Sequence, residues 1–481
     1  MSKAKRLRLA AQVVFCALLV AGCTARAQKQ EWFGVLSPPP GQTLRYISGS
    51  EPESLDPQVS SSQVDARIDV ALYEGLLEYH PKTLEPIPGI AERWVSNGDT
   101  SEFVFFLRRN AKFSNGDPIT ARDFVYTVRR GLRPELASRV AFMAWDIKYA
   151  EAFNTGGAFV RDPKTGRFVL ASEAAESEGE GGGASQAATA QESAKAGYDI
   201  APETDFHKLI HEPERLVVPS DEKQRAKQVK ASSKLAALLE GKELVPVKAE
   251  DIGVEAVDDY TIRFTMKQPT PYFLGITQHQ FFRALHEKTV ERFGVAWSKP
   301  GNIVCSGSHM LAEHTPYYQI VVVKNPNYWD AARVRLEKIT FVPLEEQTTM
   351  MNLYKAGEID ATYNHTVPAS WLKAGVRYVK DYMDAPENGS QYWQLNTKSG
   401  PTTDKRFRKA LAISIDRKAL ESFRVVSKAN GAFVPTGILP GYQSPPGFTL
   451  DVEGAKRLLA EAGYKDASGN FDRSNFPDAS L

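Results

Sequence analysis

Helix-like and strand-like segments alternate along this sequence from about residue 42 to residue 464. Runs such as SEFVFFLRR and YQIVVVK are rich in aromatic and β-branched residues, which is typical of strands, whereas TARDFVYTVRRGL places apolar residues on one helical face. The segment GVEAVDDYTIRFTM predicts two strands joined by a turn at Asp258-Asp259. A chain with this alternation and several hairpins is expected to have an α/β fold with mixed sheets.

The helix around residues 121–131 is marked at both ends. Thr120 and Asp123 form a Thr-x-x-Asp capping box, Phe124 and Val128 share one face, and Gly131 is a stop signal. Three further helices are predicted at Lys223–Leu239, in DKRFRKALAISIDRKALESF and after the cap Asp451, the last one ending at Gly463. A fifth helix is expected to end at Gly357.

The first 23 residues indicate export. Four cations precede a mostly apolar run over residues 9–21, which has the length of a signal-peptide core and is short for a spanning helix. The sequence Val20-Ala21-Gly22-Cys23 resembles the lipobox of bacterial lipoproteins. That resemblance implies removal of residues 1–22 and lipidation of Cys23, which would hold the protein at a membrane. The alternative is an ordinary signal peptide with a chance cysteine.

Length, charge and composition indicate the number of domains and exclude some classes of partner. A chain of 481 residues is long for one core, so two or three domains are expected. The formal net charge is +1, or −3 without residues 1–22, so there is no electrostatic reason to expect nucleic acid as a partner. No later segment has 18 consecutive apolar residues. Residues 171–197 are dominated by Gly, Ala, Ser, Glu and Gln and are expected to form a disordered loop.

A series of motifs in order resembles one known family. They include EPESLDPQ, LYEGLLEY, FVFFLRRNAKFSNGDPITARDFVYTVRR, KNPNYWD, YKAGEIDATY, YWQLN and AKRLLAEAGY. Together they resemble the extracytoplasmic oligopeptide-binding lipoproteins of ABC transporters, in the dipeptide/oligopeptide/nickel solute-binding family. The resemblance runs from about Leu44 to about Tyr464 and is interrupted by residues 171–197.

The resemblance implies a periplasmic-binding-protein-like fold of two lobes with an additional third domain. The ligand would be an oligopeptide held between lobes through its backbone, and the partners would be the permease subunits of the transporter and a membrane reached by the N-terminal lipid. We expect a monomer that lies outside the cytoplasm, in the periplasm or on the outer cell surface, with no cofactor, no metal and no enzyme activity.

The implied divisions are a signal peptide at 1–22, domain I at 24–73 and 287–385, domain II at 74–286, and domain III at 386–481.

Matching the family's ligand-facing segments position by position implies six ligand residues in three places. They are Ser62 and Gln63 after LDP, Asn364 and His365 after EIDATY, and the aromatic pair Tyr392 and Trp393. Peptide-binding relatives hold the peptide ammonium with an aspartate in a late Trp-x-x-Asp-Tyr-like segment, which is not among residues 1–481. Domain III is therefore expected to be incomplete here, and residues 1–481 are expected to bind peptide weakly or not at all.

Two alternatives stay open at this point. Members of the same family also bind nickel, haem or oligosaccharides. An extracytoplasmic hydrolase is the rival from another class, since CSGSH places Cys305 close to His309 in sequence, and His207 and His211 are spaced as helical metal ligands. The sequence contains no Gly-x-Ser-x-Gly, His-Glu-x-x-His or phosphate-loop motif.

Overall fold

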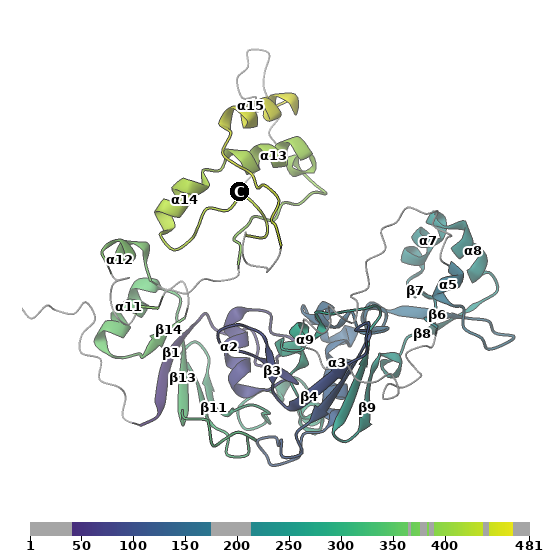
Figure 1. Cartoon of the computed structure of the whole chain (residues 1–481), viewed down its shortest axis with the longest axis horizontal. Helices are drawn as coiled ribbons and strands as arrows, with labels where there is room; N and C mark the ends of the chain where they lie inside the picture. The colour runs from purple at the N-terminus through teal and green to yellow at the C-terminus, as the bar shows by residue number, and fades with distance from the viewer. Residues whose placement is uncertain are drawn as a thin grey trace, which may run out of the picture. The chain divides into compact units, whose positions relative to one another are not determined.

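The computed structural model describes residues 41–174, 213–363, 367–375, 382–383, 389–435 and 442–464. The chain divides into a larger compact unit, Val35–Asn364, and a smaller one that contains His365–Leu481. The mixed α/β class expected from the sequence is confirmed, and the described residues of the larger unit form four sheets. Figure 1 shows the elements of both units.

A five-stranded mixed sheet forms the first part of the larger unit, in the order β11-β12-β13-β1-β14. Strand β1 lies between β13 and β14 and runs parallel to both, whereas β12 is antiparallel to β11 and β13. Ile320, Val322 and Phe341 are buried on this sheet and pack with the helix α2 (Gln63–Leu72). The strands are β1 (Thr43–Gly49), β11 (His309–Thr315), β12 (Gln319–Lys324), β13 (Lys338–Pro343) and β14 (Ala361–Thr362).

A four-stranded antiparallel sheet forms the second part, in the order β4-β5-β10-β9. Helix α3 (Ala121–Gly131) lies along it, and its predicted capping box and buried residues Phe124 and Val128 are confirmed. The turn predicted at Asp258-Asp259 is also confirmed. The strands are β4 (Ala91–Ser96), β5 (Glu102–Leu107), β9 (Val254–Asp258) and β10 (Thr261–Thr265), and a separate pair is formed by β2 (Leu77–Tyr79) and β3 (Pro86–Pro88).

The described residues between 157 and 247, which are 157–174 and 213–247, form a small lobe with a core of its own. Its sheet has the order β7-β6-β8, and Val160, Leu216 and Val218 are buried against the helices. The single helix predicted at Lys223–Leu239 is wrong, because Ser232 leaves helical geometry and its hydroxyl caps a second helix by accepting from the Leu235 amide. Residues 175–212 lie outside the described residues. The elements are α5 (Ala171–Ala174), β6 (Gly157–Arg161), β7 (Val217–Pro219), α7 (Glu222–Ala231), α8 (Ser233–Leu239) and β8 (Glu243–Pro246).

The larger unit also contains several short helices that connect these parts. The helix that ends at Gly357 is confirmed, and Gly357 has a φ of 75°, which glycine adopts without strain. The connecting helices are α4 (Ala150–Asn154), α9 (Phe273–Ile276), α10 (Glu287–Phe293) and α11 (Gln347–Ala356).

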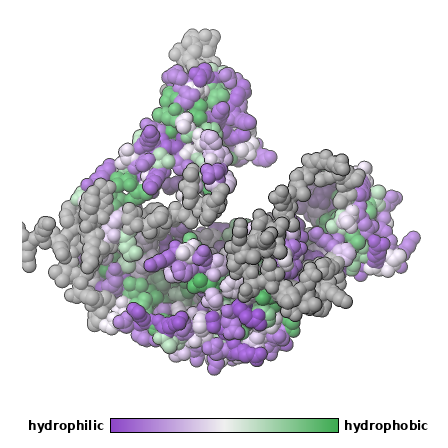
Figure 2. Space-filling view, in the orientation of Figure 1, coloured by the Kyte–Doolittle hydropathy of each residue, from purple (hydrophilic) through white to green (hydrophobic). Residues whose placement is uncertain are grey.

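The described residues of the smaller unit contain helices joined by long irregular segments. The single helix predicted through DKRFRKALAISIDRKALESF is wrong: α13 (Lys405–Ser414) and α14 (Arg417–Arg424) are separate, because Asp416 caps the second by accepting from the Ala419 amide at 2.9 Å. Asp451 caps α15 (Val452–Glu461) as predicted, and α12 (Ala369–Lys373) precedes these helices. Apolar side chains reach the visible surface over α13 to α15 (Figure 2).

A close backbone crossing at Gly307 gives a stability test. A Cβ at this position would lie 2.7 Å from Ala71 O and from the backbone of Leu72 and Tyr73 at the end of α2. Since backbone atoms cannot move aside cheaply, Gly307→Ala is expected to lower the free energy of unfolding by about 1–3 kcal/mol in urea denaturation. Gly98→Ala is the control, because Gly98 has open space and an ordinary φ. Equal stability of the two variants would contradict this crossing.

Candidate ligand-binding site

The carboxyl ends of β1, β13 and β14 form one edge of the five-stranded sheet, here called the carboxyl edge. Tyr363 follows β14 directly, and the Arg67 guanidinium carbon lies 5.1 Å from the centre of its ring. A Cβ on Gly49 would lie 3.1 Å from Val64 and 3.5 Å from the Tyr363 ring. In open α/β sheets, ligands bind just beyond the carboxyl ends of the strands. This edge is therefore the candidate site in the larger unit.

The predicted ligand residues Ser62 and Gln63 lie beside this edge, at the start of α2. Ser62 is the N-cap, and its hydroxyl accepts from the Asp65 amide at 3.2 Å. Gln63 is exposed, and its Oε1 accepts from Arg67 Nη2 at 3.4 Å. Arg67 therefore contacts both Gln63 and Tyr363, which brings the segments after β1 and β14 together.

Asp65 fixes the loop that carries Ser62, and sequence reasoning missed it. Its buried carboxylate accepts from the amides of Glu53 at 2.9 Å, Ser62 at 3.0 Å and Ser61 at 3.3 Å. The side chain thus binds both ends of the loop between β1 and α2. The Ser-x-x-Asp spacing of residues 62–65 was the available signal, since it has the same form as the box at Thr120.

A buried ion pair holds the same loop against α3. Arg130 Nη2 lies 2.6 Å from Asp56 Oδ2, and both side chains are 8% exposed. Trp297 Nε1 donates to the same carboxylate at 3.2 Å, and Arg130 Nη1 donates to Gln58 Oε1 at 2.7 Å. Gln58 Nε2 in turn donates to Thr127 O at 2.6 Å. The LDPQ motif therefore fixes the loop that leads to Ser62 and Gln63 by binding it to α3.

Another buried carboxylate, that of Glu74, lies between the end of α2 and the start of β2. Glu74 accepts from Tyr328 Oη at 2.8 Å and from Trp329 Nε1 at 2.7 Å. Burial, followed by repulsion from Glu78, raises the pKa of Glu74 to about 8. Glu78 itself is paired with Arg283 at 2.6 Å. The aromatic pair of NPNYW, Tyr328 and Trp329, therefore supplies hydrogen-bond donors to the Glu74 carboxylate.

The remaining predicted ligand residues are placed as follows. Tyr392 and Trp393 belong to the smaller unit and are 55% and 74% exposed, and the Tyr392 ring lies 5.1 Å from the Phe433 ring. Asn364 and His365, and the lipidation candidate Cys23, lie outside the described residues. A common site for all six residues thus stays a prediction.

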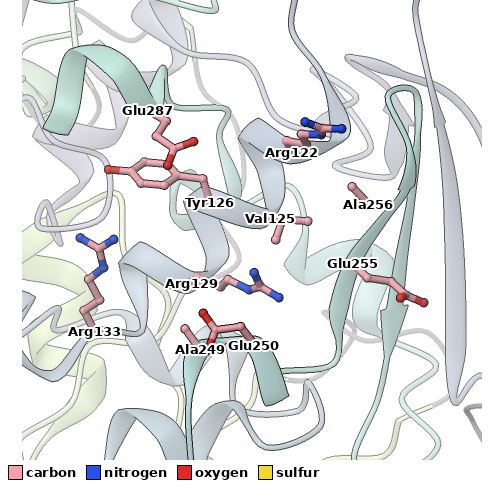
Figure 3. A pocket seen from close by; sticks show the side chains of 10 residues that line it. All are labelled: Arg122, Val125, Tyr126, Arg129, Arg133, Ala249, Glu250, Glu255, Ala256 and Glu287. Carbon is pink, nitrogen blue, oxygen red and sulfur yellow. The ribbon is translucent and has the colours of Figure 1, made fainter. Parts of the chain in front are cut away.

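A separate hollow of about 440 Å³ lies beside α3. Arginines of α3 face glutamates of β9, α10 and the short turn Ala249–Asp251 across it (Figure 3). None of Ser62, Gln63, Tyr392 and Trp393, the predicted ligand residues that the structure describes, lines it. Its lining residues are Arg122, Val125, Tyr126, Arg129, Arg133, Ala249, Glu250, Glu255, Ala256 and Glu287.

The features that suggested a hydrolase have structural roles where they are described. Cys305 is fully buried, and burial raises the pKa of its thiol to about 12, so the thiolate needed for attack is not available at neutral pH. His309 bonds to Ser308 and to Leu336 O. His207 and His211 lie outside the described residues, and among the described ones no three His, Cys, Asp or Glu side chains are grouped to hold a metal.

No helix within the described ranges has both the length and the apolar character to span a bilayer.

Comparison with known proteins agrees with this architecture. The chain is 29% identical over 434 residues to the periplasmic oligopeptide-binding protein OppA of Escherichia coli, and this match covers 88% of the chain but 63% of that protein. The match to the E. coli periplasmic murein peptide-binding protein MppA is 27% identical and covers 94% of the chain and 68% of that protein. The chain thus spans about two thirds of the length of these relatives.

Solved structures of OppA proteins also align with this chain. Burkholderia pseudomallei OppA aligns with a TM-score of 0.63 at 26% identity, over 89% of this chain and 68% of that one. Haemophilus influenzae OppA in complex with RPPGFSPFR aligns with a TM-score of 0.63 at 25% identity, over 89% and 67%. The model of the bacterial extracellular solute-binding proteins, family 5 Middle, matches residues 85–479. The chain therefore belongs to family 5 of the bacterial extracellular solute-binding proteins.

Proposed function

We propose that the chain is the substrate-binding component of a bacterial peptide ABC importer, which captures oligopeptides outside the cytoplasm and delivers them to the permease. The observation that carries this proposal is the family membership, together with relatives whose names state oligopeptide and murein peptide binding. The H. influenzae relative has been crystallised with a nine-residue peptide. The carboxyl edge beside Gln63 and Tyr363 supplies a surface of the kind such a ligand requires.

The proposed recognition uses the peptide backbone. An extended peptide presents the same row of N–H and C=O groups whatever its sequence, so pairing with them gives affinity without reading side chains. Side-chain pockets that hold water tolerate different residues, because bridging waters replace fixed partners. The exposed Gln63 amide can both donate and accept, and the exposed rings of Tyr392 and Trp393 offer apolar contact surface.

The domain divisions and the tether are part of this proposal. Boundaries at 73/74 and 286/287 are supported by the pairing of the two connecting segments, in which the Ala284 amide donates to Glu74 O at 3.0 Å. Asn364 and His365 would join Ser62 and Gln63 as ligand residues. We further propose that Cys23 becomes the acylated N-terminus of a monomeric protein anchored to a membrane.

Native mass spectrometry of the natural gene product, purified without denaturation, tests the function and the tether together. We expect bound peptides of mixed sequence, which acid releases, and an acylated Cys23 as the first residue. A bile acid among the bound masses would instead favour a ligand like that of the E. coli probable deoxycholate-binding protein YgiS, to which the chain is 26% identical. Bound nickel, haem or oligosaccharide with no peptide would also contradict the proposal.

A further inference from the structure

The turn between β11 and β12 places a tyrosine where glycine is favoured. The Tyr318 amide donates to Thr315 O at 3.1 Å, Pro316 is the second residue, and Tyr317 has a φ of 60°. This is the pattern of a type II turn, whose third residue is usually glycine or asparagine because a Cβ is strained there. Strained backbone of this kind persists where surrounding contacts hold it and is common at functional sites, so the turn is a candidate for function.

Hydrogen bonds to Glu51 hold the turn in place, and its two aromatic rings are exposed. Glu51 Oε2 accepts from the Tyr317 amide at 2.9 Å, and Glu51 Oε1 lies 2.8 Å from His314 Nε2. The Tyr317 side chain is 83% exposed and that of Tyr318 is 64% exposed. Two large rings are thus presented to solvent on a rigid support. Tyrosine in such a position gives contact area at low conformational entropy cost.

The turn lies at the carboxyl edge. Strand β12 is antiparallel to β13, so the start of β12 lies beside the end of β13, and β13 is parallel to β1. Glu51 also belongs to the loop that leads from β1 to Gln63. With the order β11-β12-β13-β1, three strand spacings separate β11 from β1, or about 14 Å. An extended peptide covers that distance with about four residues.

We propose that Tyr317 and Tyr318 form an outer contact for the bound peptide, which only a ligand longer than about four residues reaches from the region of Gln63 and Tyr363. The proposal rests on the peptide-binding function proposed above. It makes the turn a determinant of ligand length, because a short peptide ends before the two rings and a long peptide packs on them. A few buried aromatic contacts commonly dominate such interfaces.

The experiment compares two peptides on the natural gene product by calorimetry. The probes are the nonapeptide RPPGFSPFR and its C-terminal tripeptide PFR, and the variant carries Tyr317→Gly with Tyr318→Ser. We expect the variant to bind the nonapeptide about tenfold more weakly and the tripeptide within a factor of about two of wild type. Its melting temperature should be equal or higher, because glycine adopts the positive φ without strain.

Tyr272→Ser is the matched control, since Tyr272 is 54% exposed but lies next to α9, outside the five-stranded sheet. It should leave both affinities unchanged. Unaltered nonapeptide affinity in the turn variant, or an equal loss for both peptides, would overturn the outer contact while leaving the proposed function in place. Failure of wild type to bind either peptide would overturn the proposed function, and the outer contact with it.

Discussion

Asp56→Ala is expected to lower the free energy of unfolding of the larger unit by about 3–5 kcal/mol, as measured by urea denaturation followed through tryptophan fluorescence. The variant leaves the Arg130 guanidinium buried without its carboxylate, and removes an acceptor from Trp297 Nε1. The cost comes mainly from the uncompensated charge, because neither side chain is exposed enough for water to replace the lost partner.

Two further variants show whether the buried charge is the cause. Adding Arg130→Met to Asp56→Ala removes the orphaned charge, so the double variant should be more stable than Asp56→Ala alone. Glu53→Ala breaks the ion pair with Arg139, whose side chain is 69% exposed, and should cost less than about 1 kcal/mol. If Asp56→Ala cost no more than Glu53→Ala, the loop before Ser62 would not be fixed as described.

Glu74→Gln is expected to stabilise the protein at alkaline pH and to change stability little at pH 5. The pKa of Glu74 is raised from 4.5 to about 8 in the folded chain, so between these values the folded chain holds a proton that the unfolded chain releases. Stability therefore falls as pH rises through this window, by up to about 5 kcal/mol at its upper end. Glutamine carries no charge and removes this loss.

The neighbours of Glu74 can accommodate the amide. Trp329 Nε1 can donate to the amide oxygen, and the amide nitrogen can donate to the Tyr328 hydroxyl, which also accepts hydrogen bonds. The measurement is denaturant unfolding of wild type and variant at pH 5 and pH 9. Glu135→Gln, at an exposed position, controls for a general charge effect and should behave alike at both values. A stability difference independent of pH would contradict the raised pKa.

The features predicted best from the sequence are those that depend only on residues close together in the chain, such as helix caps. The capping box at Thr120, the cap at Asp451 and the stop at Gly357 need only contacts within one turn of a helix, and all three are confirmed. The helix predicted through Asp416 was wrong because its apolar periodicity outweighed a cap signal inside it. The small lobe of residues 157–174 and 213–247 was missed because its strands pair across a long low-complexity segment.

The support of the candidate site could not be found by spacing alone. Asp56 and Arg130 are 74 residues apart, and charged residues are usually exposed, so nothing local marks them as a buried pair. The exposed Gln63 was found through resemblance, whereas Asp65 beneath it had a local signal. The turn at Tyr317 has no sequence signal except Pro316. A glycine at the third position would have indicated a type II turn, but tyrosine stands there.

The position of β1 has a consequence for biosynthesis. It is the first strand of the sheet to be made, and its neighbour β13 begins about 295 residues later. At ribosomal rates of about 5–20 residues per second, β1 waits roughly 15–60 s for a partner. During that interval β1 lacks its native partner, so we expect the pairing of so distant a contact to be a slow step in folding.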